Sequence, residues 1–392
     1  MHVLIRSKTH GGYAVVDQIK VKCLAFGRGA ALSLAILLSA LLVMFASTTP
    51  SVAAEYRVVE LQTGGHNSKA QAISGGSVAG NTSDTFFHAL MWNDKGGPFT
   101  DLNPRRFDIS YAEDIDGNRV VGWGGSYRNH ALLWSGSAAS AVDLNPTGAE
   151  FSQAFGIRGS QVVGRGGKIE PFHALMWPDG TPGNVVDLNP RGYELSGAVA
   201  TTGTRQGGYG VLNGGHGVVR PLLWSSTPDT FVDLLPPGAF GGIVTAMSGD
   251  QQVGFVASVE GPVSHAMLWT GTAASAVDLH PAVGFTETTA EDTNGRQQVG
   301  YGKGSVTGGT FHALLWDGDN VVQDLHRFLP AGAVASIASG IDDDGTIVGS
   351  ATFGGQTVRP IMWVPVPDPA NCAVFLLPAA LLCRRTGRSK GT

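Results

Sequence analysis

The chain has 392 residues, of which 56 are glycine and only 15% are charged. Helical proteins normally carry many Lys and Glu residues on their surfaces, so this composition argues against a helical fold and favours short strands joined by turns. The three cysteines, Cys23, Cys372 and Cys383, all lie near the chain ends. A disulfide scaffold is therefore excluded for the region between them, whose length allows a buried core to hold it together.

Charge is distributed unevenly along the chain. Residues 1–54 carry a net charge of +4 and residues 364–392 carry +3, so the whole-chain charge of −5 leaves −12 for the region between them. A region with that charge repels phosphate groups. We therefore expect no nucleic acid among its partners.

Residues 1–54 are typical of a signal peptide. Five basic residues precede the mostly apolar run Ala30–Ala46, and the small residues of Ser51–Ala54 follow it. Signal peptidase cleaves after small residues of this kind, which predicts an exported mature chain beginning at Glu55. An uncleaved anchor helix is the alternative interpretation.

The region from residue 55 to residue 363 consists of seven units, each marked by a pentapeptide that ends in tryptophan. Successive tryptophans are 42 to 47 residues apart. The pentapeptide begins with histidine in five units and with arginine in two. Its copies are His88–Trp92, His130–Trp134, His173–Trp177, Arg220–Trp224, His265–Trp269, His312–Trp316 and Arg359–Trp363.

Two further signatures accompany the pentapeptide. An Asp-Leu pair follows the first six copies by about ten residues, and a Val-Gly element precedes most copies. Polar glycine-containing turns such as Asp116-Gly117-Asn118, themselves preceded by strand-like stretches, come before the Val-Gly element. Each unit is therefore predicted to form four short β-strands. The Asp-Leu pairs begin at Asp101, Asp143, Asp187, Asp233, Asp278 and Asp324.

Four antiparallel strands in about 45 residues, repeated seven times, match the blade period of a β-propeller. The mature sequence opens with Tyr56–Leu61, which resembles the Asp-Leu strand, whereas the seventh unit stops at Trp363 without one. We therefore predict an all-β, seven-bladed propeller over residues 55–363, closed by the N-terminal strand. Other all-β stacks are the alternative, although an open solenoid would need polar caps that neither end shows.

The repeated His-Ala-Leu-x-Trp, Asp-Leu-Asn and Val-Val-Gly elements between Tyr56 and Trp363 resemble the HAF repeats of bacterial extracellular proteins. The family has Phe at the third position of the pentapeptide, where this chain has Leu, Met or Ile. Arg-Pro also replaces His-Ala in the fourth and seventh copies. The resemblance implies an extracellular location and no particular chemistry, because most members have no assigned activity.

Residues 364–392 resemble a PEP-CTERM sorting tail of Gram-negative bacteria. Pro367-Asp368-Pro369 stands where that tail has Pro-Glu-Pro, and it precedes the mostly apolar stretch Ala370–Cys383 and the basic pair Arg384-Arg385. The resemblance implies processing by an exosortase-like enzyme and display at the cell surface or in the extracellular matrix. The apolar stretch is shorter than the ~20 residues of a spanning helix, so we expect only transient membrane contact. A short buried helix or a plain anchor is the alternative.

The five anchor histidines suggest a metal site, because imidazole is a common ligand. Equivalent residues on separate blades lie around a ring, too far apart to share one ion, and arginine takes their place in two units. We therefore interpret the anchors as framework residues that hydrogen-bond one strand or blade to another, and we expect no cofactor. The tryptophans are interpreted as blade core, with a row of exposed sugar-stacking rings as the alternative.

Two acidic clusters, Glu113–Gly117 and Asp342–Gly345, supply carboxylates of the kind that Ca²⁺ prefers. Both fall where a hairpin turn is expected, and Arg158-Gly159-Ser160 takes that place in another unit. We interpret both clusters as turn-forming, with Ca²⁺ binding as the weaker alternative.

No catalytic motif is apparent in the sequence. Gly75–Ala79 approaches Gly-x-Ser-x-Gly but lacks the final glycine. We therefore expect a non-catalytic binding or structural module, with an extracellular polysaccharide or a surface protein as its partner. The alternative is a carbohydrate-active enzyme, a glycosidase or lyase, whose site lies in the central channel. That alternative predicts acidic or Tyr insertions that break the repeat in one or two units, and the sequence shows only the acidic residues of the two clusters expected at turns.

Overall fold

The computed structural model describes residues 3–10, 13–21 and 55–367, except for 84–86, 94–95, 215–216, 259–262 and 355. The chain divides into two compact units, Met1–Ala53 and Ala54–Thr392. In the first unit, β1 (Val3–His10) and β2 (Tyr13–Val21) pair antiparallel, which the sequence did not predict. Most of the predicted signal segment and residues 368–392 of the predicted sorting tail lie outside the described residues. No helix in the described part of the chain is long and apolar enough to span a membrane.

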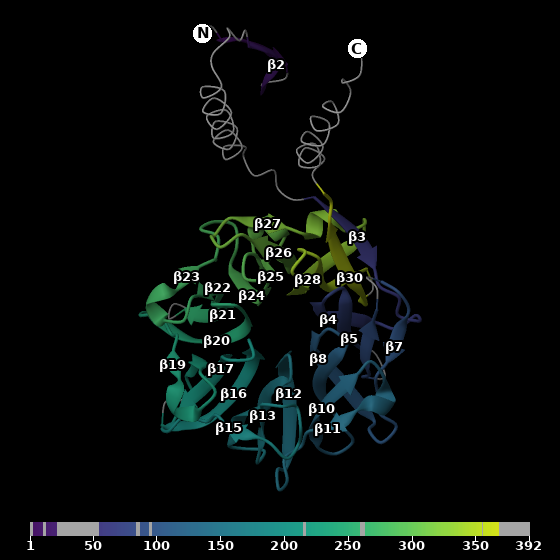
Figure 1. Ribbon diagram of the computed structural model, residues 1–392, viewed down its shortest axis with the longest axis vertical. Coiled ribbons are helices and arrows are strands. Elements are labelled where there is room, and N and C mark those ends of the chain that lie inside the picture. The colour runs from purple at the N-terminus through teal and green to yellow at the C-terminus, as the bar shows by residue number, and fades with distance from the viewer. Residues whose placement is uncertain are drawn as a thin grey trace, which may run out of the picture. The chain divides into compact units, whose positions relative to one another are not determined.

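The second unit is a ring of seven four-stranded antiparallel sheets, which confirms the predicted propeller (Figure 1). Blades 1 and 2 comprise β4 (Ser68–Ser74), β5 (Ser77–Thr82), β6 (Ala89–Trp92), β7 (Phe99–Asp101), β8 (Ile109–Asp116), β9 (Arg119–Gly125), β10 (Asn129–Ser135) and β11 (Val142–Asp143). Blades 3 and 4 comprise β12 (Phe151–Arg158), β13 (Gln161–Gly167), β14 (Phe172–Trp177), β15 (Val186–Asp187), β16 (Tyr193–Thr201), β17 (Gln206–Leu212), β18 (Val219–Trp224) and β19 (Val232–Asp233). Blades 5 and 6 comprise β20 (Ala239–Ser248), β21 (Gln251–Ser258), β22 (Ser264–Trp269), β23 (Val277–Asp278), β24 (Glu287–Thr293), β25 (Gln298–Lys303), β26 (His312–Trp316) and β27 (Val322–Asp324).

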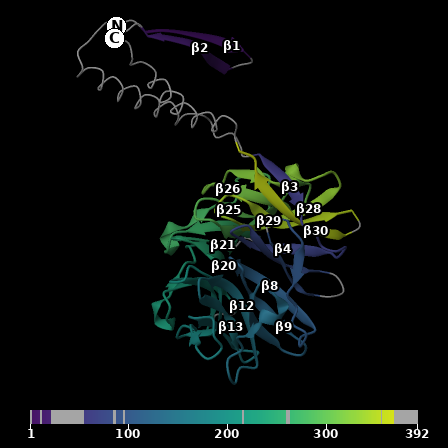
Figure 2. The same ribbon diagram turned by 45° about the vertical axis from the view of Figure 1, so that its right-hand side comes forward.

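Blade 7 joins the two ends of the ring. It comprises β28 (Ala333–Ile341), β29 (Ile347–Phe353), β30 (Thr357–Pro365) and, as its fourth strand, β3 (Tyr56–Glu60). Figure 2 shows β3 alongside β30, and their register pairs Tyr56 with Pro365. The predicted closure by the N-terminal strand is therefore confirmed.

The anchor tryptophans lie in the core rather than on an exposed surface, since all seven side chains are fully buried. Four of them also bond to the preceding blade. The indole Nε1 of Trp177 donates to the carbonyl of Leu144 at 3.0 Å, and Trp316 and Trp363 donate to equivalent leucine carbonyls. Trp92 donates to the carbonyl of Gln62, one residue beyond the equivalent leucine. The large buried ring at each junction packs with apolar side chains of both neighbouring blades, which helps to hold the blades together.

A hydroxyl group provides a second link between blades. The backbone N–H of Ala131 in blade 2 donates to Oγ of Ser152 in blade 3 at 3.0 Å, and four other junctions have the same bond. At the junction of blades 4 and 5, Pro221 has no N–H to donate. The register places Gly242 at the position of the absent hydroxyl there. Donor and acceptor are thus lost together.

Each innermost strand contains a β-bulge, and a glycine of the Val-Gly signature faces it. In blade 2, Gly122 pairs with Ala112 beside the bulge, and a Cβ on Gly122 would lie 1.8 Å from the carbonyl oxygen of Tyr111. The corresponding distances in the other blades are 1.9 to 2.1 Å. Only glycine permits this close approach, which explains the signature physically. The other six glycines are Gly80, Gly164, Gly208, Gly254, Gly300 and Gly349.

Candidate functional site

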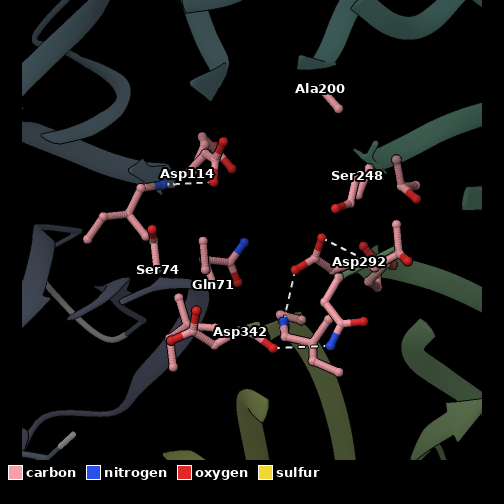
Figure 3. Close-up of a pocket in the computed structure, with 18 of the residues that line it drawn as sticks. Gln71, Ser74, Asp114, Ala200, Ser248, Asp292 and Asp342 are labelled. Carbon is pink, nitrogen blue, oxygen red and sulfur yellow. Dashed lines mark hydrogen bonds between the residues drawn. The ribbon is translucent and has the colours of Figure 1, made fainter. Parts of the chain in front are cut away.

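The seven bulges build one chamber on the axis of the ring. A bulge leaves one residue per strand unpaired and turns its side chain away from the ladder. All seven unpaired residues are half-buried, and all seven line a cavity of about 900 Å³ (Figure 3). In blade order they are Gln71, Glu113, Phe155, Val199, Thr245, Glu291 and Ser339.

Turns between the first and second strands of the blades form the rim of this chamber. Ser74, Asp116, Asn294 and Asp342 are among the lining residues contributed by the rim. We call this side of the ring the turn face. The chamber therefore extends from the bulges, deep in the channel, to the turn face.

Two glutamates at the bulges are held by aromatic donors. The indole Nε1 of Trp123 donates to Oε1 of Glu113 at 2.9 Å, and the hydroxyl of Tyr301 bonds to Glu291. Burial raises the pKa of each glutamate to about 7, although the bond from Trp123 and the charge of Arg165 oppose the shift at Glu113. Each glutamate is therefore positioned to exchange a proton near neutral pH.

An aspartate follows each of these glutamates. Asp114 accepts the backbone N–H of Ile157 in the next blade at 2.8 Å, and Asp292 accepts that of Ile341 at the same distance. Burial raises the pKa of Asp114 to about 6 and that of Asp292 to about 7, where the charge on Asp114 adds to the effect. Blades 2 and 6 thus share one departure from the repeat. The other five blades have Ala or Gly at this position, namely Ala72, Gly156, Ala200, Ala246 and Gly340.

The chamber wall is apolar on one side and polar on the other. Blades 3 to 5 contribute mainly apolar side chains, among them Phe155, Val199 and Met247, together with Arg158, Thr201, Thr245 and Ser248. Blades 6, 7, 1 and 2 contribute mainly carboxyl, amide and hydroxyl groups. Figure 3 shows Ala200 across the chamber from Gln71 and Asp342. A ligand in the chamber meets both kinds of surface.

The acidic clusters predicted at turns occupy two kinds of position. Glu113 and Asp114 lie within β8 rather than at the turn, so their predicted placement was wrong. Their position follows from the bulge, which adds a residue to the strand before the turn at Gly117. Asp116 accepts the N–H of Gly159 in the next blade, and Asp342 accepts those of Gly75 and Gly76 in blade 1.

No group of three or more His, Cys, Asp or Glu side chains suited to a metal ion occurs among the residues that the structure describes.

The pentapeptide anchors lie outside the chamber, and the structure does not bring them together. Each anchor side chain contacts a carboxylate on the fourth strand of its own blade. His130, for example, lies 2.8 Å from Oδ2 of Asp143, and Arg359 lies 3.1 Å from Glu60 on the closing strand. The other pairs are His88–Asp101, His173–Asp187, Arg220–Asp233, His265–Asp278 and His312–Asp324. These contacts tie the third strand to the fourth.

Sequence reasoning missed Glu291, Asp292, Trp123 and Tyr301 as site residues. A signal for them was present, because Glu-Asp occurs at the same place in two units and an aromatic residue follows the Val-Gly element in both. Comparing the seven units position by position would have found this pair of departures.

Comparison with known proteins identifies the fold alone. No family model and no curated protein matches the sequence. Among solved structures, a puromycin hydrolase matches with a TM-score of 0.53 and 10% identity, covering 81% of this chain and 57% of that one. A puromycin-hydrolyzing peptidase of Mycobacterium tuberculosis matches with a TM-score of 0.52 and 14% identity, covering 76% and 52%. An oligogalacturonate lyase in complex with manganese matches with a TM-score of 0.53 and 10% identity, covering 82% and 96%. The chain thus spans about half the length of the two hydrolases.

Proposed function

We propose that this chain is an exported, surface-displayed protein that binds a ligand in the chamber of its central channel. The observation that carries the proposal is the shared departure of blades 2 and 6, where Glu-Asp pairs supported by Trp123 and Tyr301 face the cavity. The other five blades have Ala or Gly at the position of the aspartate and still form the ring. Burying a carboxyl group costs free energy. Asp114 and Asp292 offset that cost by bonding to the next blade, so Glu113 and Glu291 are the carboxyl groups on which the proposal rests.

Export and display rest on the chain ends. The signal-peptide pattern of residues 1–54 and the Pro367-Asp368-Pro369 tail support processing by signal peptidase and an exosortase-like enzyme. The same proposal includes that the chain is a HAF-repeat protein and that it is located in the extracellular polysaccharide matrix. Cell fractionation of a bacterium that produces the chain tests this proposal. The double variant Pro367→Ala/Pro369→Ala is expected to be lost from the surface fraction in which the unmodified chain is found. Unchanged surface display would contradict the sorting role.

Ligand binding is tested by filling the chamber. Ala200 is buried in the apolar wall, so Ala200→Trp is expected to block the cavity, whereas Val142→Trp alters an exposed position on β11. A thermal-shift screen of matrix oligosaccharides and small metabolites should yield a ligand for the unmodified chain and for Val142→Trp only. Equal shifts in Ala200→Trp would place the ligand elsewhere and contradict the proposal.

A second candidate function is catalysis in the same chamber. The pKa near 7 of Glu113 and Glu291 favours it, because general acids of glycosidases are carboxyl groups with raised pKa values. Neutral oligosaccharides are suitable first substrates, because the acidic residues of the lining outnumber the basic ones and would repel an anionic sugar. If the unmodified chain releases products and both Glu113→Gln and Glu291→Gln lose that activity, the chain is an enzyme. If the unmodified chain converts none of the ligands found in the screen into products, the result supports a non-catalytic binding module.

A further inference from the structure

The chamber holds many more acidic groups than basic ones. Its lining includes eight acidic residues and two basic ones, Lys69 and Arg158. Arg158 lies 3.7 Å from Asp116, so its charge is already matched at the rim. The acidic residues are Glu113, Asp114, Asp116, Glu291, Asp292, Asp342, Asp343 and Asp344. Above neutral pH, where the four bulge carboxyl groups with raised pKa values also ionise, this excess of negative charge in a partly desolvated cavity attracts cations.

The deep glutamates have acceptor capacity that the protein does not use. Trp123 bonds to Oε1 of Glu113, and Oε2 has no hydrogen-bond partner among the described residues. An ionised carboxylate only accepts hydrogen bonds. The bulge geometry turns Glu113 and Glu291 into the cavity, so a bound molecule is placed to supply the donors. Charged donors form the strongest bonds of this kind.

The opposite wall restricts the rest of the ligand. Phe155, Val199 and Met247 offer no side-chain hydrogen-bond donor or strong acceptor. The hydroxyl groups of Thr201 and Thr245, on the same side, already donate to backbone carbonyl oxygens of the protein. A sugar ring would bury several hydroxyl groups against mainly apolar side chains here, whereas an alkyl or aromatic body would bury apolar surface. The two walls together favour a molecule with one cationic end and one apolar end.

We infer that the chamber binds an organic cation, a protonated amine carried on an apolar body. The amine lies against Glu113 and Glu291, and the body lies against Val199 and Met247. This inference rests on the proposed function, since it names the ligand class for the same chamber.

A matched pair of probes tests the ligand class on the mature chain. 2-Phenylethylamine and 2-phenylethanol have the same body and differ in the charged group. Titration calorimetry at pH 8, where the glutamates are mostly ionised and the amine is protonated, should give at least tenfold tighter binding of the amine. Equal affinities, or tighter binding of the alcohol, would overturn the inference.

Variants then locate the amine. Glu291→Gln preserves an acceptor for Tyr301 but removes the charge, and it is expected to weaken amine binding about tenfold while leaving alcohol binding unchanged. Glu287→Gln is the control, because Glu287 lies on the same strand, is bonded to Lys303 at 2.6 Å and does not line the chamber. Glu113→Gln gives an independent second test should one variant fold poorly. Equal effects of the Glu287 and Glu291 substitutions would overturn the assignment.

The outcomes separate this inference from the broader proposal. Binding of a neutral oligosaccharide that Ala200→Trp abolishes, with no binding of the amine, means that the ligand class is wrong and the chamber site stands. If Ala200→Trp leaves the binding of every ligand unchanged, the chamber is not the binding site.

Discussion

Two buried tryptophans that differ in one hydrogen bond allow a direct measurement of the junctions between blades. Trp177 and Trp134 are both fully buried anchors in neighbouring blades. Nε1 of Trp177 donates to the carbonyl of Leu144 at 3.0 Å, whereas Nε1 of Trp134 has no acceptor among the described residues. Replacing either ring by phenylalanine leaves a similar void, so the two variants differ mainly in the bond.

The expected difference follows from that bond. Trp177→Phe leaves the Leu144 carbonyl without its indole donor, and an unsatisfied buried polar group costs about 1 to 3 kcal/mol. Trp134→Phe removes a buried donor that had no partner, which offsets part of the cost of the smaller ring. We therefore expect Trp177→Phe to lower the free energy of unfolding by ~2 kcal/mol more than Trp134→Phe.

Urea denaturation of both variants measures this difference, provided that the dependence of the free energy on urea stays the same. Trp177→His, which retains a ring N–H, serves as an additional comparison. Equal losses for Trp177→Phe and Trp134→Phe would refute the claim that the indole bond links the blades.

Three further predictions concern closure, the bulges and the acidic chamber. Deleting residues 55–62 removes the fourth strand of blade 7, and we expect the melting temperature to fall by ~5 °C or more; an unchanged value would contradict closure. Gly300→Ala places a Cβ 2.0 Å from a carbonyl oxygen and should destabilise the chain by about 1 to 3 kcal/mol, whereas Gly183→Ala, with open space around it, should have little effect in the same urea titration. Glu113 and Glu291 have pKa values raised to about 7 in the folded chain, so it binds more protons than the unfolded chain between about pH 4.5 and 7. Their contribution to stability is complete below that range and is lost as the pH rises through 7. Asp114 and Asp292 contribute a similar loss, so replacing both glutamates by Gln should reduce, but not abolish, the fall in unfolding free energy between about pH 5 and 8; an identical pH profile would contradict the raised pKa values.

The architecture was predictable because its causes are repeated seven times. A tryptophan buried at each junction and a glycine opposite each bulge are local requirements, so they recur at a fixed period in the sequence. Closure was predictable for the same reason, since the missing fourth strand of blade 7 had a matching segment at Tyr56–Glu60. The hydrogen-bond partner of each anchor histidine was not predicted, because it depends on the register between the third and fourth strands.

The chamber was harder to predict because it results from irregularities. A bulge shifts the register by one residue, and the sequence alone does not show which residue is left unpaired. Glu113 was consequently interpreted as part of a turn, and Glu291 was not singled out. Only the ring brings these two side chains, 178 residues apart in numbering, into one cavity.

A structure of the mature chain bound to a ligand from the screen tests the central claim most directly. We predict that the ligand lies on the ring axis, in contact with Glu113 and Glu291 and with the apolar wall at Val199. A ligand bound instead at the loops opposite the turn face, for example near the exposed side chains of Tyr127 and Val283, would contradict it.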